Sequence, residues 1–147
     1  QDDYTFAHSV NVCSFAILIG MSCSLRRDQL RELAIGALMH DLGKTLVPSD
    51  LLKKPGPLSP AEYEQVREHA SAGFEILRRQ GEIGLLSAHI AFQHHERMDG
   101  SGYPRGLAGS EIHLYGRIVA VADVYDALVS DRAYRPRFYL IGLLSCC

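Results

Sequence analysis

Histidine and aspartate side chains fall on the apolar faces of predicted helices. His40 follows Ala37 by three residues and Asp41 follows Leu38 by three, which predicts that both lie on one apolar stripe. Asp123 shares a face with apolar residues inside the run 118–124. A carboxylate on such a face is costly unless it is paired, protonated or bound to metal. Taken singly, the first pair could reach water at a helix end, and Asp123 could form a buried salt bridge.

More histidines follow the same pattern. His69 lies three residues after Val66, on the predicted inner face of its helix, and His8 shares a stripe with Val12. His94 and His95 are adjacent. Adjacent residues point about 100° apart on a helix, so both can serve one site at a helix end or beside a broad cleft.

A single shared metal site explains these residues together. A helical bundle can point ligands from every helix at a common axis. Histidine and carboxylate without cysteine suit a dinuclear iron or manganese centre better than structural zinc, although zinc or nickel can occupy such sites. Seven ligands exceed what one catalytic ion needs, so two ions bridged by Asp41 are expected. The predicted ligands are His8, His40, Asp41, His69, His94, His95 and Asp123.

The elements that must carry these ligands are helical almost throughout. Apolar periodicity predicts helices over about 4–24, from an N-cap at Asp28 to Gly43, 60–80, 83–95 and 114–129. Ser59, a following proline and Glu62 form a capping box before the third of these helices. The segment 98–110, with four glycines, is predicted to be a loop. No long alternating strand pattern occurs, so the predicted fold class is all-α.

Composition limits the classes of protein that fit. The 147 residues are 47% hydrophobic and 22% charged, which predicts one domain with a core of its own. A net charge of −2 argues against binding to nucleic-acid polymers. The four cysteines form no C-x-x-C pair, which argues against a zinc knuckle and fits a reducing, cytoplasmic location. No membrane span is predicted in this segment.

Two motifs carry a family resemblance. Residues 40–44, HDLGK, resemble the HD-x-G-K signature of the HD phosphohydrolase superfamily, and residues 94–104, HHERMDGSGYP, resemble the HHE-x-x-DG-x-GYP signature of its HD-GYP subfamily. The resemblance covers roughly residues 4–135 and implies an HD-domain helical bundle. The expected organisation is a catalytic core over 1–135 and a divergent or truncated tail over 136–147.

The resemblance implies a bacterial phosphodiesterase that hydrolyses cyclic di-GMP to pGpG and, in many members, on to GMP. A hydroxide bridging the two metals would attack phosphorus in line with the leaving oxygen. One metal would be held by His8, His40, Asp41 and Asp123, and the other by Asp41, His69, His94 and His95. Some members hold a third metal through a glutamate where this chain has Tyr4, so a binuclear centre is expected.

Further roles follow from the same resemblance. Lys44 would place a positive charge near the developing negative one, which makes it a candidate catalytic and substrate-binding residue beside Asp41. Other candidate substrate contacts are Arg97, Arg132, Tyr134 and Arg135. The loop formed by Asp99, Gly100, Gly102, Tyr103 and Pro104 is expected to contact other proteins, particularly GGDEF diguanylate cyclases. A receiver or sensor domain is expected upstream in the full-length protein.

Two other functions stay open at this stage. The chain could be a catalytically weak receptor that binds cyclic di-GMP or a cyclase, although the presence of all seven ligands disfavours this. It could also be an HD hydrolase of another nucleotide, such as ppGpp or a related cyclic dinucleotide, because contacts to a guanine base are not legible in the sequence.

Overall fold

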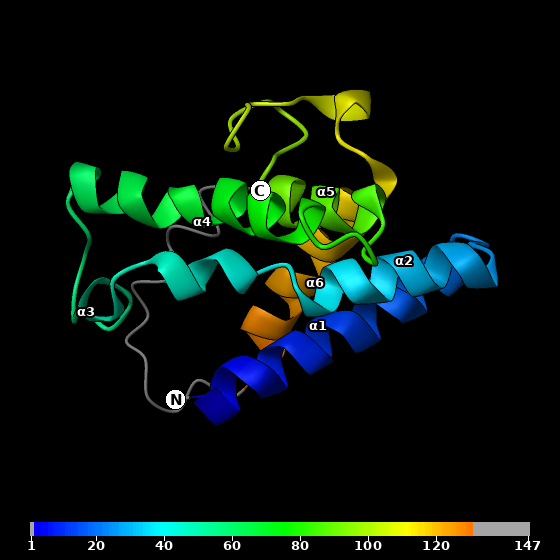
Figure 1. Cartoon of the computed structure of the whole chain (residues 1–147), viewed down its shortest axis with the longest axis horizontal. Coiled ribbons are helices and arrows are strands. Elements are labelled where there is room, and N and C mark those ends of the chain that lie inside the picture. The colour runs from blue at the N-terminus through cyan, green and yellow to red at the C-terminus, as the bar shows by residue number, and fades with distance from the viewer. Residues whose placement is uncertain (1, 131–147) are drawn as a thin grey trace.

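The described part of the chain, residues 2–130 of the computed structural model, is built from helices (Figure 1). No strand occurs within these residues, and the all-α prediction is confirmed. The long helices are α1 (Asp2–Ser22), α2 (Arg27–Leu38), α4 (Pro60–Arg78), α5 (Leu85–Gln93) and α6 (Leu114–Val129). Shorter elements are η1 (Leu42–Leu46), α3 (Ser49–Leu52) and η2 (Gly109–Glu111).

The main core lies where α1, α2, α5 and α6 meet. Val12 of α1, Leu33 of α2, Ile90 of α5 and Val119 of α6 are each at most 1% exposed and belong to one apolar cluster. A second, smaller cluster around Leu77 joins α4 to α5. Because apolar burial is the main stabilising term in folding, these two clusters fix how the helices that carry the predicted ligands lie relative to one another.

Local sequence signals set the starts of α4 and α6. The Ser59 backbone N–H donates to the Glu62 carboxylate at 2.7 Å, and the Glu62 N–H donates to the Ser59 hydroxyl at 3.3 Å, so the predicted capping box is present. At the start of α6, the Tyr115 N–H donates to Nδ1 of His113 at 3.2 Å. Two backbone donors that lack partners within the helix are thereby satisfied at these helix ends.

The bounds of α2 and α5 differ from the prediction. Helix α2 begins with Arg26, not Asp28, at its N-cap and ends at Leu38, so His40 and Asp41 lie in the following turn and not on a helical stripe. Helix α5 ends at Gln93, which leaves His94 and His95 just beyond it. His40 and His94 are nevertheless buried, with 0% and 3% of their surface exposed.

A close backbone approach explains where the chain goes after α2. A Cβ atom added to Gly43 would lie 1.9 Å from the His69 carbonyl oxygen and 2.6 Å from the Gly73 nitrogen. Only a residue without a side chain lets η1 lie this close to α4. The contact brings the turn that holds Asp41 beside His69.

Helix α1 is apolar enough to raise the question of a membrane. By length and composition alone, Thr5–Ser22 could cross one, with a mean hydropathy of 1.4. The core helix of a soluble protein passes the same test. Here α1 packs against α2 and α6 and contributes Val12 to the core.

The chain after Ser130 lies outside the described residues. It includes the predicted substrate contacts Arg132, Tyr134 and Arg135 and the predicted tail 136–147.

Candidate metal centre

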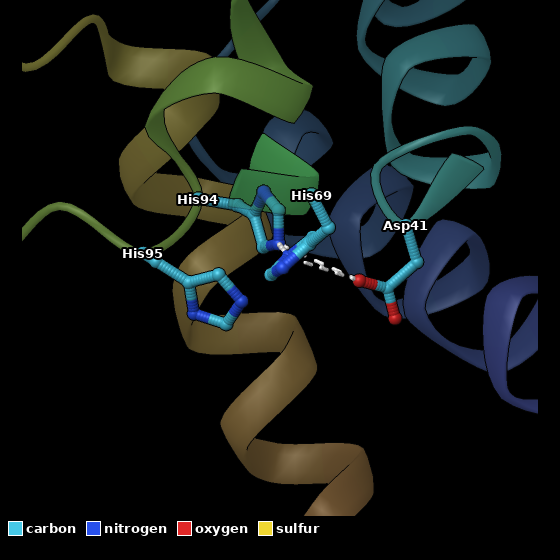
Figure 2. Close-up of side chains that lie close together, drawn as sticks. All are labelled: Asp41, His69, His94 and His95. Atoms are coloured by element: carbon cyan, nitrogen blue, oxygen red, sulfur yellow. Dashed lines mark hydrogen bonds and ion pairs between the residues drawn. The ribbon is translucent and has the colours of Figure 1, made fainter. Parts of the chain in front are cut away.

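Two groups of potential metal ligands share Asp41. Asp41, His69, His94 and His95 each offer one ligand atom, and these atoms lie within 4.8 Å of one another (Figure 2). His8, His40 and Asp41 form a second group by the same measure. Asp123 adjoins the second group, because its Oδ1 lies 3.2 Å from His8 Nε2. The structure therefore brings all seven predicted ligands into one region.

The seven ligands come from five separate parts of the chain. His8 lies on α1, His69 on α4 and Asp123 on α6, while the turn after α2 and the end of α5 supply the others. His40, His69 and His94 are each at most 3% exposed. The two apolar clusters hold the helices on which these side chains depend.

Backbone carbonyls orient three of the histidines. Nδ1 of His40 donates to Ala37 at 2.7 Å, Nδ1 of His69 to Val66 at 2.6 Å, and Nδ1 of His94 to Ala91 at 2.9 Å, in each case to the carbonyl three residues earlier. A carbonyl oxygen is an acceptor, so each Nδ1 carries the proton and each neutral ring has a lone pair at Nε2. Such contacts fix tautomer and orientation in metal-binding histidines.

The resulting lone pairs converge without a donor between them. His69 Nε2 lies 3.4 Å from His94 Nε2, and the two atoms lie 3.6 and 3.7 Å from Asp41 Oδ1. Among residues 2–130, neither Asp41 Oδ1 nor His40 Nε2 has a hydrogen-bond partner, although both atoms are buried. Buried acceptors that face one another are costly, and a cation removes that cost. The residues therefore fit divalent metal ions.

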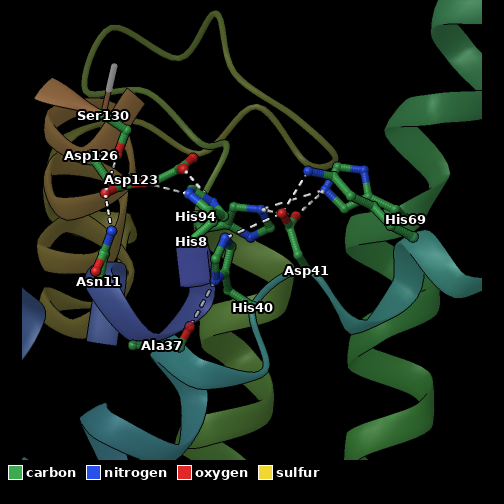
Figure 3. A network of polar contacts seen from close by, with 11 residues as sticks. His8, Asn11, Ala37, His40, Asp41, His69, His94, Asp123, Asp126 and Ser130 are labelled. Atoms are coloured by element: carbon green, nitrogen blue, oxygen red, sulfur yellow. Dashed lines mark hydrogen bonds and ion pairs between the residues drawn. The ribbon is translucent and has the colours of Figure 1, made fainter. Parts of the chain in front are cut away.

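A carboxylate, not a carbonyl, holds His8 (Figure 3). Its Nδ1 lies 2.7 Å from Asp126 Oδ2, while Asn11 and Ser130 donate to Asp126 Oδ1 at 2.9 and 2.8 Å. Asp126 is 2% exposed. Asp126 is not among the site residues predicted from the sequence. The available signal was a second acidic residue three positions after Asp123, on the same helical face.

Burial and charge set the protonation states that metal binding needs. Burial lowers the pKa of His69 to about 4 and lowers the pKa of His95 well below its ordinary value. Burial works to raise the pKa of Asp41, but the nearby positive charge of Lys44 works against it, and that pKa lies well below its usual range. Near neutral pH the two imidazoles are neutral and the carboxylate is ionised.

The predicted substrate contacts before residue 131 have other partners as well. Lys44 Nζ donates to Asp41 Oδ2 at 2.5 Å, and its side chain is 37% exposed. Arg97 Nε lies 3.9 Å from Asp99 Oδ1. Lys44 thus lies beside the ligands, whereas Arg97 lies at the start of the loop.

The predicted partner loop is packed against the metal centre on one side. Asp99 is exposed, but the Tyr103 ring stacks on His95, with centroids 4.7 Å apart and planes 24° apart. Glu96, which the sequence analysis overlooked, is buried and accepts hydrogen bonds from the backbone N–H groups of Arg105 and Leu107 at 2.8 and 2.9 Å. Its position directly after His95 was the only clue to this role.

Comparison with known proteins gives a consistent family. Residues 5–145 match the family model described as HD domain. The chain is 42% identical over 135 residues to a Pseudomonas aeruginosa protein named cyclic di-GMP phosphodiesterase, which covers 92% of this chain and 33% of that protein. It is 43% identical over 136 residues to a Thermotoga maritima protein of the same name, with 92% and 37% covered.

A Vibrio cholerae relative has a different name. It is called 3′3′-cGAMP-specific phosphodiesterase 3 and is 41% identical over 135 residues, with 92% of this chain and 29% of that protein covered. The chain thus spans about a third of the length of the curated relatives it matches.

Solved structures show the same fold. An HDG"Y"P protein from Bdellovibrio bacteriovorus superposes with a TM-score of 0.72 at 24% identity, over 85% of this chain and 41% of that one.

Proposed function

The chain belongs to the HD domain family, and on this premise we propose that it is a metal-dependent phosphodiesterase that hydrolyses cyclic di-GMP to pGpG, the first product, which some HD-GYP proteins hydrolyse further to GMP. One observation carries the proposal: two groups of potential ligand atoms meet at a single shared carboxylate, Asp41. That arrangement suits two ions held side by side, as in two-metal phosphoryl-transfer sites. The names of the relatives from P. aeruginosa and T. maritima supply the substrate.

The proposed cofactors are two divalent ions, iron or manganese. His8, His40, Asp41 and Asp123 would hold one ion, and Asp41, His69, His94 and His95 would hold the other. When bound, such ions activate a water molecule and neutralise charge on a phosphodiester. Tyr4 offers no carboxylate for a third ion, so the proposed centre is binuclear.

Chain residues prepare the site for this chemistry. The backbone carbonyls of Ala37, Val66 and Ala91 keep three ring protons away from the ligand atoms, so these imidazoles face the centre with lone pairs. Lys44 keeps Asp41 ionised and, being partly exposed, can also donate to a substrate phosphate. The other proposed substrate contacts are Arg97, Arg132, Tyr134 and Arg135.

A second substrate is favoured by a specific observation. Three V. cholerae relatives, 41%, 37% and 36% identical to the chain, are named 3′3′-cGAMP-specific phosphodiesterases. Identity to them is close to the identity to the relatives named for cyclic di-GMP. The mixed cyclic dinucleotide is therefore the second candidate substrate.

We also propose a partner protein, an upstream domain and a cellular location. The resemblance to HD-GYP proteins supports GGDEF diguanylate cyclases as partners of the loop 99–104 and a receiver or sensor domain upstream. Cysteines without C-x-x-C spacing support a cytoplasmic location.

The test is turnover by metal-loaded protein. Cyclic di-GMP, 3′3′-cGAMP and ppGpp are supplied in parallel, and products are separated by chromatography. We expect the wild type to convert cyclic di-GMP to pGpG, with the amount of GMP showing whether a second hydrolysis follows. We expect the turnover rate of the Asp41→Ala variant to be at least about 100-fold lower. Metal-loaded protein that cleaves 3′3′-cGAMP and leaves cyclic di-GMP intact would favour the second candidate. Binding of cyclic di-GMP without cleavage would favour a receptor.

A further inference from the structure

Four of the five histidines at the metal centre are held through the Nδ1 atom of the ring. Backbone carbonyls accept this hydrogen bond from three of them, and the Asp126 carboxylate is the partner of His8. Within residues 2–130, the His95 ring has no such bond, although it belongs to the ligand group of Asp41. A ligand ring needs a fixed orientation, so a different contact must restrain His95.

Aromatic contacts surround His95. The Tyr103 ring is nearly parallel to it, with centroids 4.7 Å apart and planes 24° apart. His69 meets the ring edge-on, with centroids 5.0 Å apart and planes 86° apart. A parallel stack restricts ring rotation, because turning the imidazole would drive it into the face of Tyr103.

The loop backbone holds Tyr103 against His95. The Tyr103 N–H donates to the His95 carbonyl at 3.2 Å. A Cβ atom added to Gly102 would lie 2.5 Å from both the Arg97 nitrogen and that same carbonyl oxygen, so the loop packs directly on the chain that carries His95. The buried Glu96 carboxylate also fixes the later part of the loop, because it accepts hydrogen bonds from the backbone N–H groups of Arg105 and Leu107.

Helix α4 restrains the ring of Tyr103 as well. The Arg67 guanidinium lies over this ring, 4.7 Å from its centroid, and forms an ion pair with Glu64 one turn earlier. A guanidinium over an aromatic face is attracted by the negative charge density of the ring. Tyr103 is therefore held by the loop and by α4 at once.

We propose that Tyr103 is a positioning residue that keeps the His95 imidazole in its ligating orientation by ring stacking, the task that Nδ1 hydrogen bonds perform for the other four histidines. This role rests on the proposed metal centre. It gives the tyrosine of the GYP sequence a function inside the domain, independent of any partner protein.

The experiment uses the full chain and Mn²⁺ as the probe. Binding is measured by titration against a chelator, and electron paramagnetic resonance separates a coupled pair of Mn²⁺ ions from a single ion. Tyr103→Phe keeps the ring and should match the wild type. Tyr103→Leu and Tyr103→Met keep apolar volume without a ring; we expect one ion to bind about 10–100-fold more weakly and the coupled signal to disappear. Two replacements are used in case one fails to fold, which circular dichroism checks.

Tyr63→Ala is the matched control. Tyr63 also lies on α4 near Tyr103, with ring centroids 6.4 Å apart, but it is exposed and has no contact with His95. The control should bind two ions like the wild type. If folded Tyr103→Leu or Tyr103→Met binds both ions with wild-type affinity, the positioning role is refuted while the metal centre stands. If the wild type binds no ion, the metal centre is refuted and the role falls with it.

Discussion

Asp41 and Asp126 have different roles at the site: Asp41 is a candidate metal ligand, and Asp126 supports a ligand. Asp41 belongs to both ligand groups, and Lys44 keeps it ionised. Asp126 lies behind His8 as a buried acceptor, itself held by Asn11 and Ser130. A carboxylate behind a histidine increases the basicity of that ligand and fixes its tautomer. Function at this scale therefore depends on residues that would not touch the metal.

The Asp126→Asn variant tests the support of His8. The amide keeps the size of the side chain but loses its charge, so we expect metal affinity at the His8 side to fall about 10–100-fold. Competition with a fluorescent chelator measures it. Asn11→Ala removes one partner of Asp126 and leaves the carboxylate, so it should have a smaller effect. Unchanged affinity in a folded Asp126→Asn protein would contradict this role.

Among the secondary-structure elements, η1 is as important for the position of the ligands as the long helices are. Gly43 lets η1 lie directly on α4, and this contact places Asp41 beside His69. The sequence motif HDLGK thus contains both the ligands and the glycine that positions them.

The Gly43→Ala variant tests that contact. The added Cβ would overlap the His69 carbonyl, so η1 must move away from α4; we expect a loss of about 1–3 kcal/mol in the free energy of unfolding, with weakened metal binding. Urea denaturation measures the loss. Gly81→Ala is the matched control, because no atom of the described residues lies within 4 Å of its added Cβ, and it should stay within about 0.5 kcal/mol of the wild type. Equal stability of both variants would contradict the packing argument.

The capping box of α4 gives a pH-dependent prediction. The hydrogen bond from Lys54, with that from the Ser59 N–H, lowers the pKa of Glu62 to about 2 from an ordinary value of 4.5. A lowered pKa means that the carboxylate stabilises the fold above about pH 4.5 and loses this effect as the pH falls towards 2. The difference in unfolding free energy between wild type and Glu62→Gln should therefore shrink over this range. Urea denaturation at several pH values measures it, and a constant difference would contradict the prediction.

The sequence predicted which segments are helical more accurately than it predicted where the helices begin and end. Residues 114–129 were predicted to be helical, as α6 is, and the capping box fixed the start of α4. Periodicity did not reveal that α2 and α5 stop before their histidines, because residues just past a helix end still face the same core. The short elements η1 and α3 contain too few residues to show a period.

The site was predictable to a similar degree. The seven ligands were predicted from their residue types and spacing, and the structure brings those ligands together. The support of His8 by Asp126 and of the loop by Glu96 was not legible, because both depend on which backbone or ring atoms lie opposite in space.

At the scale of the whole molecule, the ligands link every long helix or its end. Metal binding should therefore stabilise the entire fold and not one element. At a free Mn²⁺ concentration 100-fold above the dissociation constant, one site contributes about 2.7 kcal/mol to the free energy of unfolding. Urea denaturation with Mn²⁺ and with a chelator measures the difference, which should vanish in Asp41→Ala. Equal unfolding curves for the wild type in both conditions would contradict a metal centre that links the helices.

The central claim is that two ions sharing Asp41 act together on a cyclic dinucleotide. The most direct test adds Mn²⁺ back to chelator-treated protein in steps, with bound metal and cyclic di-GMP turnover measured on the same sample. If both ions are needed, turnover stays low up to one ion per chain and rises to its maximum as the second ion binds. Full turnover in the metal-free protein, or at one ion per chain with no change on further addition, would contradict it.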